Sequence, residues 1–495
     1  MQKAIKVLVF LTLSGLLLFA AASLETAPEK KIFISSFIQQ QQKVAFTNTG
    51  ANDIDFDFHI NQKIFQNMNE ILVAINKMPN EFEKEPIERK AWRYITANTE
   101  QLKLHSSNVW IHNPLLMLNS LGFGLCDDLA SVLSFIWKKQ GFKSRVWGLE
   151  GHVVPEVFAQ GKWQMYDPTF GVYYLNNGNQ VASVDELSAV PELIYNPRQT
   201  LPPNLHRAFI VEARKYSKDV ASLYASKENN QVSDFYSQLN EIEDFKIHLP
   251  KGASLEFPVQ TPDSIFVPYL LGRLHLQCFI KLSLPENWHG KVNFPFMVCQ
   301  LIGKGKVRLQ GKEYLLEENI LNSELKQMGN YNNEIEFEET TGKADVYALL
   351  NPFLFNDIGQ DTITITGKDL ENLTSVTEKQ INRCNYFFTQ QKISASAWRY
   401  YNLVMNKSDT LGLPFFNTNQ TEINPETVSS SIRLLVSQMD DLTPEEKINR
   451  ADLLVKKWEA AYPKLKEVKL KKKFSFNSDP AYFALFLSYL ESNAE

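Results

Sequence analysis

The segment that constrains this chain most is residues 121–174, where a helical pattern is followed by three short strand patterns. Its apolar residues first recur at the spacing of one helical face, at Leu125, Leu129, Val132, Leu133 and Ile136. The runs KSRVWGL, HVVPEVFA and KWQMYD come next, and glycines separate them. This pattern predicts a buried helix that ends at Gly141 and an antiparallel meander packed against it.

The same pattern predicts that three reactive side chains lie near one another. Cys126 falls in the first turn of the helix, His152 begins the second strand and Asp167 closes the third. A first turn presents unpaired N–H groups and the positive end of the helix dipole, which favour a thiolate and can accept an oxyanion. An imidazole between Asp167 and Cys126 would take the thiol proton and return it to a leaving group, while Asp167 fixes its orientation and tautomer.

These motifs together resemble the transglutaminase-like superfamily of papain-like cysteine enzymes. The resemblance rests on GLCDDLA, GFKSRVWGLEGHVVPEV and GKWQMYDPTFG, which occur in the family's order. The spacings are compact, with 26 residues from Cys126 to His152 and 15 from His152 to Asp167. The close match spans about residues 110–180. It implies an α+β, papain-like domain in which the three residues form a Cys-His-Asp triad.

The resemblance also implies a reaction. Cys126 would attack a carboxamide or peptide carbonyl and form a thioester, which then passes to water or to an amine. The superfamily includes protein cross-linkers, proteases, deamidases and peptide N-glycanases. We expect hydrolysis by a protease or amidase, because water needs no second binding site. The family places an upstream polar or aromatic side chain at the oxyanion site, and Trp110 and Asn119 are the candidates here.

Two features depart from the family's pattern and bear on catalytic strength. Many members place an aromatic residue two positions after the histidine, where this chain has Val154. Asp127 and Asp128 suit the helix dipole, but their charges oppose a thiolate on Cys126. The rival hypothesis is therefore an exported binding or scaffolding protein that keeps the fold with weak or no catalysis, and whose β domain recognises a glycan or cell-envelope component.

Each triad residue also has a purely structural interpretation. Cys126 would be a small buried residue, His152 a hydrogen-bonded structural histidine, and Asp167 a turn residue before Pro168. A metal site built from the three residues lacks the ligand-pair spacing of familiar zinc sites. We therefore expect no metal and no cofactor.

The first 22 residues have the pattern of a secretory signal peptide. Lys3 and Lys6 precede an apolar run, and three alanines ending at Ala22 provide a cleavage site before Ser23. The alternative is an uncleaved anchor, but Val7 to Ala22 is 16 residues, shorter than the roughly 20 that span a bilayer. We expect an exported protein, periplasmic or secreted, without a transmembrane segment after cleavage.

The remaining chain divides into three regions by pattern. Residues 23–240 are predicted to form the transglutaminase-like domain with helical flanks. Alternating, β-branched runs predict an antiparallel, sandwich-like β domain over residues 241–370. Residues 371–495 return to helical spacing and are predicted to be mostly helical. Three regions suit a chain of 495 residues, at about 150 residues per domain.

Four cysteines occur in the sequence, too few for a disulfide scaffold or a cysteine-rich metal module. If residues 275–284 and 291–301 form a hairpin around the turn NWHG, Cys278 faces Cys299. Such a pair would be either a disulfide or two buried free thiols. Cys126 and Cys384 have no evident partner in the sequence.

Composition narrows the class of partner. Hydrophobic residues make up 44% of the chain and the formal net charge is −5, so the chain can build a core but lacks the positive excess that a phosphate backbone requires. We expect a protein, peptide or envelope-polymer substrate and no nucleic acid. Nothing in the sequence fixes the oligomeric state.

Overall fold

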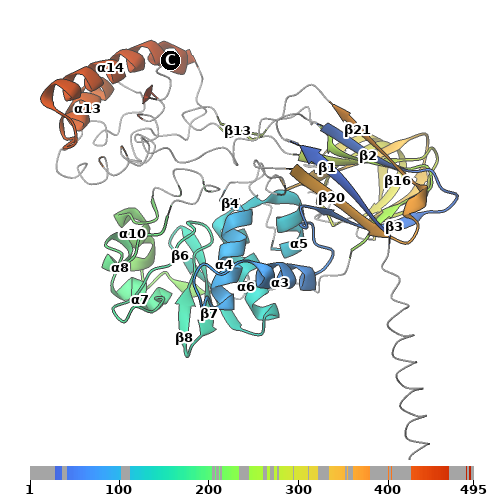
Figure 1. The fold of residues 1–495 in the computed structure, drawn as a ribbon, viewed down its shortest axis with the longest axis horizontal. Helices are drawn as coiled ribbons and strands as arrows, with labels where there is room; N and C mark the ends of the chain where they lie inside the picture. The colour runs from blue at the N-terminus through green and yellow to red at the C-terminus, as the bar shows by residue number, and fades with distance from the viewer. Residues whose placement is uncertain are drawn as a thin grey trace, which may run out of the picture.

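The protein is described by a computed structural model with mixed α+β architecture (Figure 1). It describes residues 28–35, 42–101, 112–202, 207, 211, 214–233, 245–259, 265–267, 273–275, 278–293, 295–309, 311–321, 334–351, 354, 360–379, 400, 403, 425–467, 487 and 490–491. The predicted signal segment 1–22, Trp110 and Cys384 lie outside these residues.

The helix and meander predicted over residues 121–174 are confirmed. Helix α6 (Cys126–Lys139) packs on an antiparallel sheet of order β8-β7-β6-β9. The strands are β6 (Lys143–Leu149), β7 (His152–Ala159), β8 (Lys162–Met165) and the short β9 (Gln231–Val232). Gly141, with φ 90°, ends the helix, and Gly151 and Gly161 occupy the two strand turns with φ 83° and 80°. Positive φ is readily available to glycine, so these residues fix where the chain reverses.

Further helices surround this sheet. On one side, α4 contacts both α3 and α6, and on the other α7, α8 and α10 contact one another (Figure 1). Their bounds are α3 (Met68–Lys77), α4 (Ile87–Asn98), α7 (Val184–Ala189), α8 (Glu192–Tyr195) and α10 (Lys218–Ala225). Upstream of α6 lie β4 (Glu100–Gln101), α5 (Pro114–Leu116), the π-helix η1 (Met117–Leu121) and β5 (Phe123–Gly124), which pairs in parallel with β4.

The β region consists of a four-stranded and a nine-stranded antiparallel sheet within the described residues. The smaller has the order β1-β20-β3-β10, and its strands are β1 (Glu29–Ser35), β3 (Ile54–Ile60), β10 (Ile247–Leu249) and β20 (Gln360–Gly367). The larger runs β15-β18-β16-β19-β14-β11-β2-β21, with β17 paired to β16. Phe58 of the smaller sheet packs edge-on against Phe257 of the larger at 4.9 Å between ring centroids, so the two sheets share a core.

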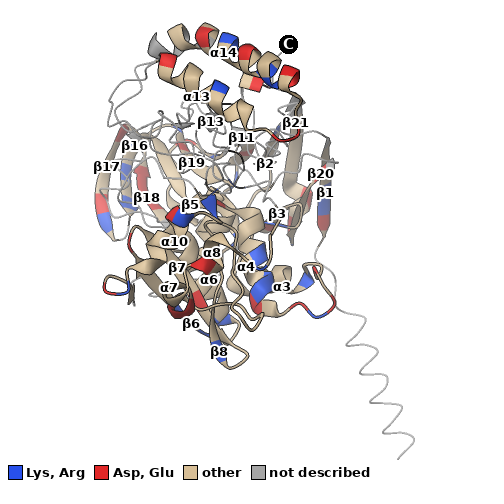
Figure 2. Ribbon diagram, turned by 90° about the vertical axis from the view of Figure 1, so that its left-hand side faces the viewer, with Lys and Arg blue, Asp and Glu red and all other residues tan. Residues whose placement is uncertain are grey.

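The larger sheet contains β2 (Gln42–Asn48), β11 (Ser254–Val259), β14 (Cys278–Leu284), β15 (Gly290–Asn293), β16 (Val298–Leu309), β17 (Lys312–Leu321), β18 (Glu334–Thr340), β19 (Ala344–Leu350) and β21 (Leu373–Lys379). The short strands β12 (Ile265–Val267) and β13 (Arg273–His275) pair with each other, and the 3-10 turn η4 (Leu370–Asn372) directly precedes β21. Charges of both signs are interspersed on β16 to β18 (Figure 2), where Arg308 lies 3.3 Å from Glu336 across neighbouring strands.

Two predicted domain boundaries are wrong. The sequence assigned residues 23–60 to the transglutaminase-like domain, but β1, β2 and β3 pair with β20, β21 and β11 of the β region, as the blue and orange strands in Figure 1 show. Residues 373–379 were assigned to the helical region but form β21. Both errors arise because these strands pair with partners far away in the sequence, and a local pattern carries no information about such partners.

The predicted hairpin that would place Cys278 opposite Cys299 is also wrong, and of the two alternatives for this pair the disulfide is excluded. Strand β14 pairs with β11 and β19, and β19 lies between β14 and β16. Two strand spacings separate the backbones by about 9–10 Å, beyond the roughly 7 Å between Cα atoms that a disulfide can bridge. Cys299 is a buried free thiol 3.3 Å from the carbonyl oxygen of Tyr347.

The two described C-terminal helices pack against each other. Helix α13 (Pro425–Ser437) contacts α14 (Pro444–Glu467) through apolar side chains that include Ile432, Leu435 and Trp458. Among the residues that the structure describes, no helix is both long and apolar enough to cross a membrane.

Candidate active site

Cys126 is the first residue of α6, and its local backbone is tightly specified. Leu125 caps the helix in an extended conformation, and its N–H donates to Asp128 Oδ2 at 2.9 Å. At Gly124 an added Cβ would lie 2.8 Å from the Cβ of Asp128, so any larger residue would displace this turn. The Cys126 side chain is half-buried against Ala130, Val146 and Val153. The thiol therefore sits at the helix end whose N–H groups have no intrahelical acceptor.

His152 begins β7, opposite Leu149 at the end of β6. Its Nε2 lies 2.8 Å from Asp167 Oδ2, and its side chain is 4% exposed. The ring of Phe170 packs edge-on against the imidazole with 5.0 Å between centroids. Because Nε2 of the imidazole is paired with Asp167, Nδ1 is the ring nitrogen that can interact with the sulfur of Cys126.

Asp167 is held rigidly behind the imidazole. Its Oδ1 accepts hydrogen bonds from the N–H groups of Thr169, at 2.7 Å, and Phe170, at 3.1 Å. Its backbone forms a bridge with Val172, and the Trp92 indole N–H donates to its carbonyl oxygen at 2.9 Å. These contacts orient the carboxylate so that Oδ2 faces the imidazole, and the side chain is fully buried.

The electrostatics of this group favour a charged imidazole. Burial lowers the pKa of His152, but the negative charges and hydrogen bonds of Asp167 and Cys126 outweigh it and raise this pKa to about 10. The charged form of His152 is then favoured at neutral pH. The three residues that the sequence singled out thus lie together, in an arrangement suited to nucleophilic catalysis.

The two oxyanion candidates from the sequence have different outcomes. Trp110 lies outside the described residues. Asn119 is buried, and its amide Nδ2 donates to the carbonyl oxygens of Phe65, at 2.8 Å, and Pro295, at 3.0 Å. Both of its N–H donors are therefore used, and the assignment of Asn119 to the oxyanion site is wrong. Its side chain instead joins η1 to the β region.

Three residues beside Cys126 could hold a cation. Ligand atoms of His112, Asp127 and Asp128 all lie within 4.8 Å of one another. Burial lowers the pKa of His112, an effect that the charge of Asp127 partly offsets. No spacing rule connects His112 to the two aspartates, so this group has no signal in the sequence, where a metal was weighed only for Cys126, His152 and Asp167.

A buried group of side chains that the sequence did not indicate holds the strand of His152 in place. Glu156 is fully buried, and its carboxylate accepts from Arg145 Nε at 2.6 Å, Trp147 Nε1 at 2.7 Å and the N–H of Val184 at 2.6 Å. This group ties β6 and β7 to the start of α7. The one feature of the sequence that could have pointed to this group is the position of Glu156 on the strand that begins with His152.

Comparison with known proteins gives no further assignment: no family model matches the sequence, and no curated protein or solved structure matches the chain.

Proposed function

We propose that this protein is a cysteine-dependent amide-bond enzyme of the transglutaminase-like type, and that it acts as a hydrolase rather than a cross-linker. The observation that carries the proposal is the buried His152, whose Nε2 is 2.8 Å from Asp167 and whose pKa is raised to about 10, chiefly by Asp167 and further by Cys126, against the effect of burial. The same geometry supports the Cys-His-Asp triad that the sequence resemblance implies.

The reaction follows from the positions of these groups. The sulfur of Cys126 attacks the carbonyl carbon of an amide and forms a C–S bond, while N–H groups at the start of α6 stabilise the oxyanion. The imidazolium of His152 gives its proton to the departing nitrogen, and the C–N bond breaks to leave a thioester. Water then attacks the thioester, His152 takes one proton from it, and the thiolate leaves.

An electrophilic carboxamide probe tests the proposal. We expect rapid formation of a single covalent adduct at neutral pH in the native protein, located on Cys126 by peptide mass mapping and absent from the Cys126→Ala variant. Cys299 provides an internal control, because burial raises the pKa of its thiol and shields it from the probe. A native protein that leaves Cys126 unmodified would favour the rival hypothesis, a binding or scaffolding protein without catalysis.

A further inference from the structure

The π-helix η1 joins the candidate active site to the β region. It spans Met117–Leu121, all five of its residues are buried, and it ends at Gly122 with φ 65°. Only β5 and Leu125 separate Gly122 from Cys126. π-Helical turns are rare and are frequently found at functional sites. A displacement of η1 would therefore be transmitted along a short, buried segment to the nucleophile.

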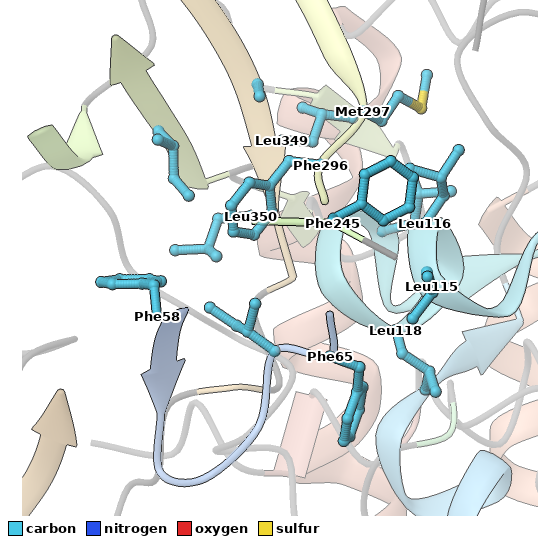
Figure 3. Packing of buried hydrophobic residues seen from close by; sticks show 14 of the residues in the cluster. Phe58, Phe65, Leu115, Leu116, Leu118, Phe245, Phe296, Met297, Leu349 and Leu350 are labelled. Atoms are coloured by element: carbon cyan, nitrogen blue, oxygen red, sulfur yellow. The ribbon is translucent and has the colours of Figure 1, made fainter. Parts of the chain in front are cut away.

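Apolar packing fixes one side of this junction. Figure 3 shows Leu116 and Leu118 of the helical segment beside Phe65, Phe296 and Leu350. These residues belong to one buried cluster that runs from the β sheets to α6. The cluster therefore makes the junction a packed interface rather than a flexible linker.

Directional hydrogen bonds fix the junction further. The Asn119 side chain brackets Phe65, since its Oδ1 accepts from the Phe65 N–H and its Nδ2 donates to the Phe65 carbonyl oxygen, both at 2.8 Å. Asn351 directly follows β19. Its N–H donates to the carbonyl oxygen of Asn119 at 2.9 Å, and its Nδ2 donates to that of Leu118 at 2.5 Å. The Ser120 hydroxyl accepts from the N–H of Met297 at 2.7 Å.

The backbone next to Phe65 is strained. Ile64, which directly precedes Phe65, has φ 79°, a conformation that β-branched residues rarely adopt. Its carbonyl oxygen is held 2.8 Å from His59 Nδ1. Such strain persists only where the surrounding contacts determine the conformation, which indicates that the junction is held in one arrangement.

Resting on the function proposed above, we infer that the β region is part of the catalytic unit, and that Asn351, Asn119 and Ser120 position Cys126 through η1. They are positioning residues, because their side chains bond to Phe65, Pro295, Met297 and the carbonyl oxygen of Leu118 rather than to the reacting groups. A misplacement of about 1 Å is enough to lower a reaction rate by 10²-fold. Loosening this junction should therefore weaken the contact between Cys126 and His152.

The Asn351→Asp variant tests this inference. The substitution keeps the side-chain shape but places a carboxylate oxygen against the carbonyl oxygen of Leu118. We expect the rate of Cys126 alkylation by iodoacetamide at pH 6 to fall about tenfold, and the acid limb of its pH profile to move to higher pH. Asn48→Asp is the matched control: Asn48 is equally buried and donates to the carbonyl oxygens of Asn52 and Leu249, but lies on β2. It should lower the melting temperature and leave the alkylation profile unchanged.

Three results would overturn the inference: a wild-type alkylation profile in Asn351→Asp, an equal loss in Asn48→Asp, or an inert Cys126 in the native protein. The first two leave the proposed function intact if alkylation still depends on His152, whereas the third removes both. If Asn351→Asp does not fold, Ser120→Ala replaces it, since this change removes only the acceptor for Met297. A folded Ser120→Ala variant with the wild-type profile would equally contradict the inference.

Discussion

Replacing His152 by alanine is expected to lower the rate of Cys126 alkylation by iodoacetamide about 10²-fold at pH 6. Only the thiolate reacts, and an ordinary thiol with a pKa of about 8.5 is roughly 0.3% ionised at that pH. In the native protein the positive charge of the neighbouring His152 imidazolium should favour the reactive thiolate over the thiol. The difference should shrink to about tenfold near pH 7, as an isolated thiol begins to ionise.

Two variants control this experiment. His152→Gln keeps a side chain against Phe170 but carries no charge, so it separates the loss of charge from the loss of packing. His248→Ala removes a half-exposed histidine that pairs with Asp55 in the β region and should alkylate at the wild-type rate. Equal alkylation of the native protein and both His152 variants at pH 6 would mean that His152 does not activate Cys126.

The Asp167→Asn variant is expected to alkylate about tenfold more slowly than the native protein at pH 6. Thr169 and Phe170 donate to Oδ1, so the asparagine oxygen should keep that position and its NH₂ group should face Nε2 of His152. That geometry requires Nε2 to be unprotonated, and so it disfavours the imidazolium. One pKa unit lost from His152 corresponds to about 1.4 kcal/mol.

The measurement for Asp167→Asn is the complete pH profile of the alkylation rate, whose acid limb should move upward by about one unit. Asp185→Asn provides the matched control, because Asp185 is 72% exposed and lies 3.7 Å from Arg145 rather than beside the triad. An unshifted profile in Asp167→Asn would show that the Asp167 charge does not sustain the imidazolium.

The sequence was most informative where the structure is local. Helix α6 and strands β6 to β8 follow each other with short glycine turns, so spacing alone predicts both the elements and the approach of Cys126, His152 and Asp167. The supporting contacts were not predictable in this way. Trp92 reaches Asp167 from α4, 75 positions away in the sequence, and Phe170 matters because of how its ring packs, not because of its spacing.

Long-range pairing explains the errors. Strands β1 to β3 have ordinary strand composition, but their partners β20 and β21 lie more than 300 residues further along the chain. The predicted hairpin between Cys278 and Cys299 is wrong because β19 lies between β14 and β16, although the latter two are close in the sequence. Asn119 looked like a catalytic donor because of its position before Cys126, whereas its partner Pro295 comes from the β region.

His152 is expected to carry a charge at neutral pH because it lies between Asp167 and Cys126. Its pKa of about 10 implies that the interaction stabilises the fold fully below pH 6.5, and that this contribution is lost as the pH rises through about 10. The most direct measurement is a ¹⁵N NMR titration of protein labelled only at its eight histidines. The His152 signal is assigned by its absence from His152→Gln. We predict an imidazolium signal that persists beyond pH 8 and weakens only near pH 10; titration of His152 near pH 6.5 would contradict the account.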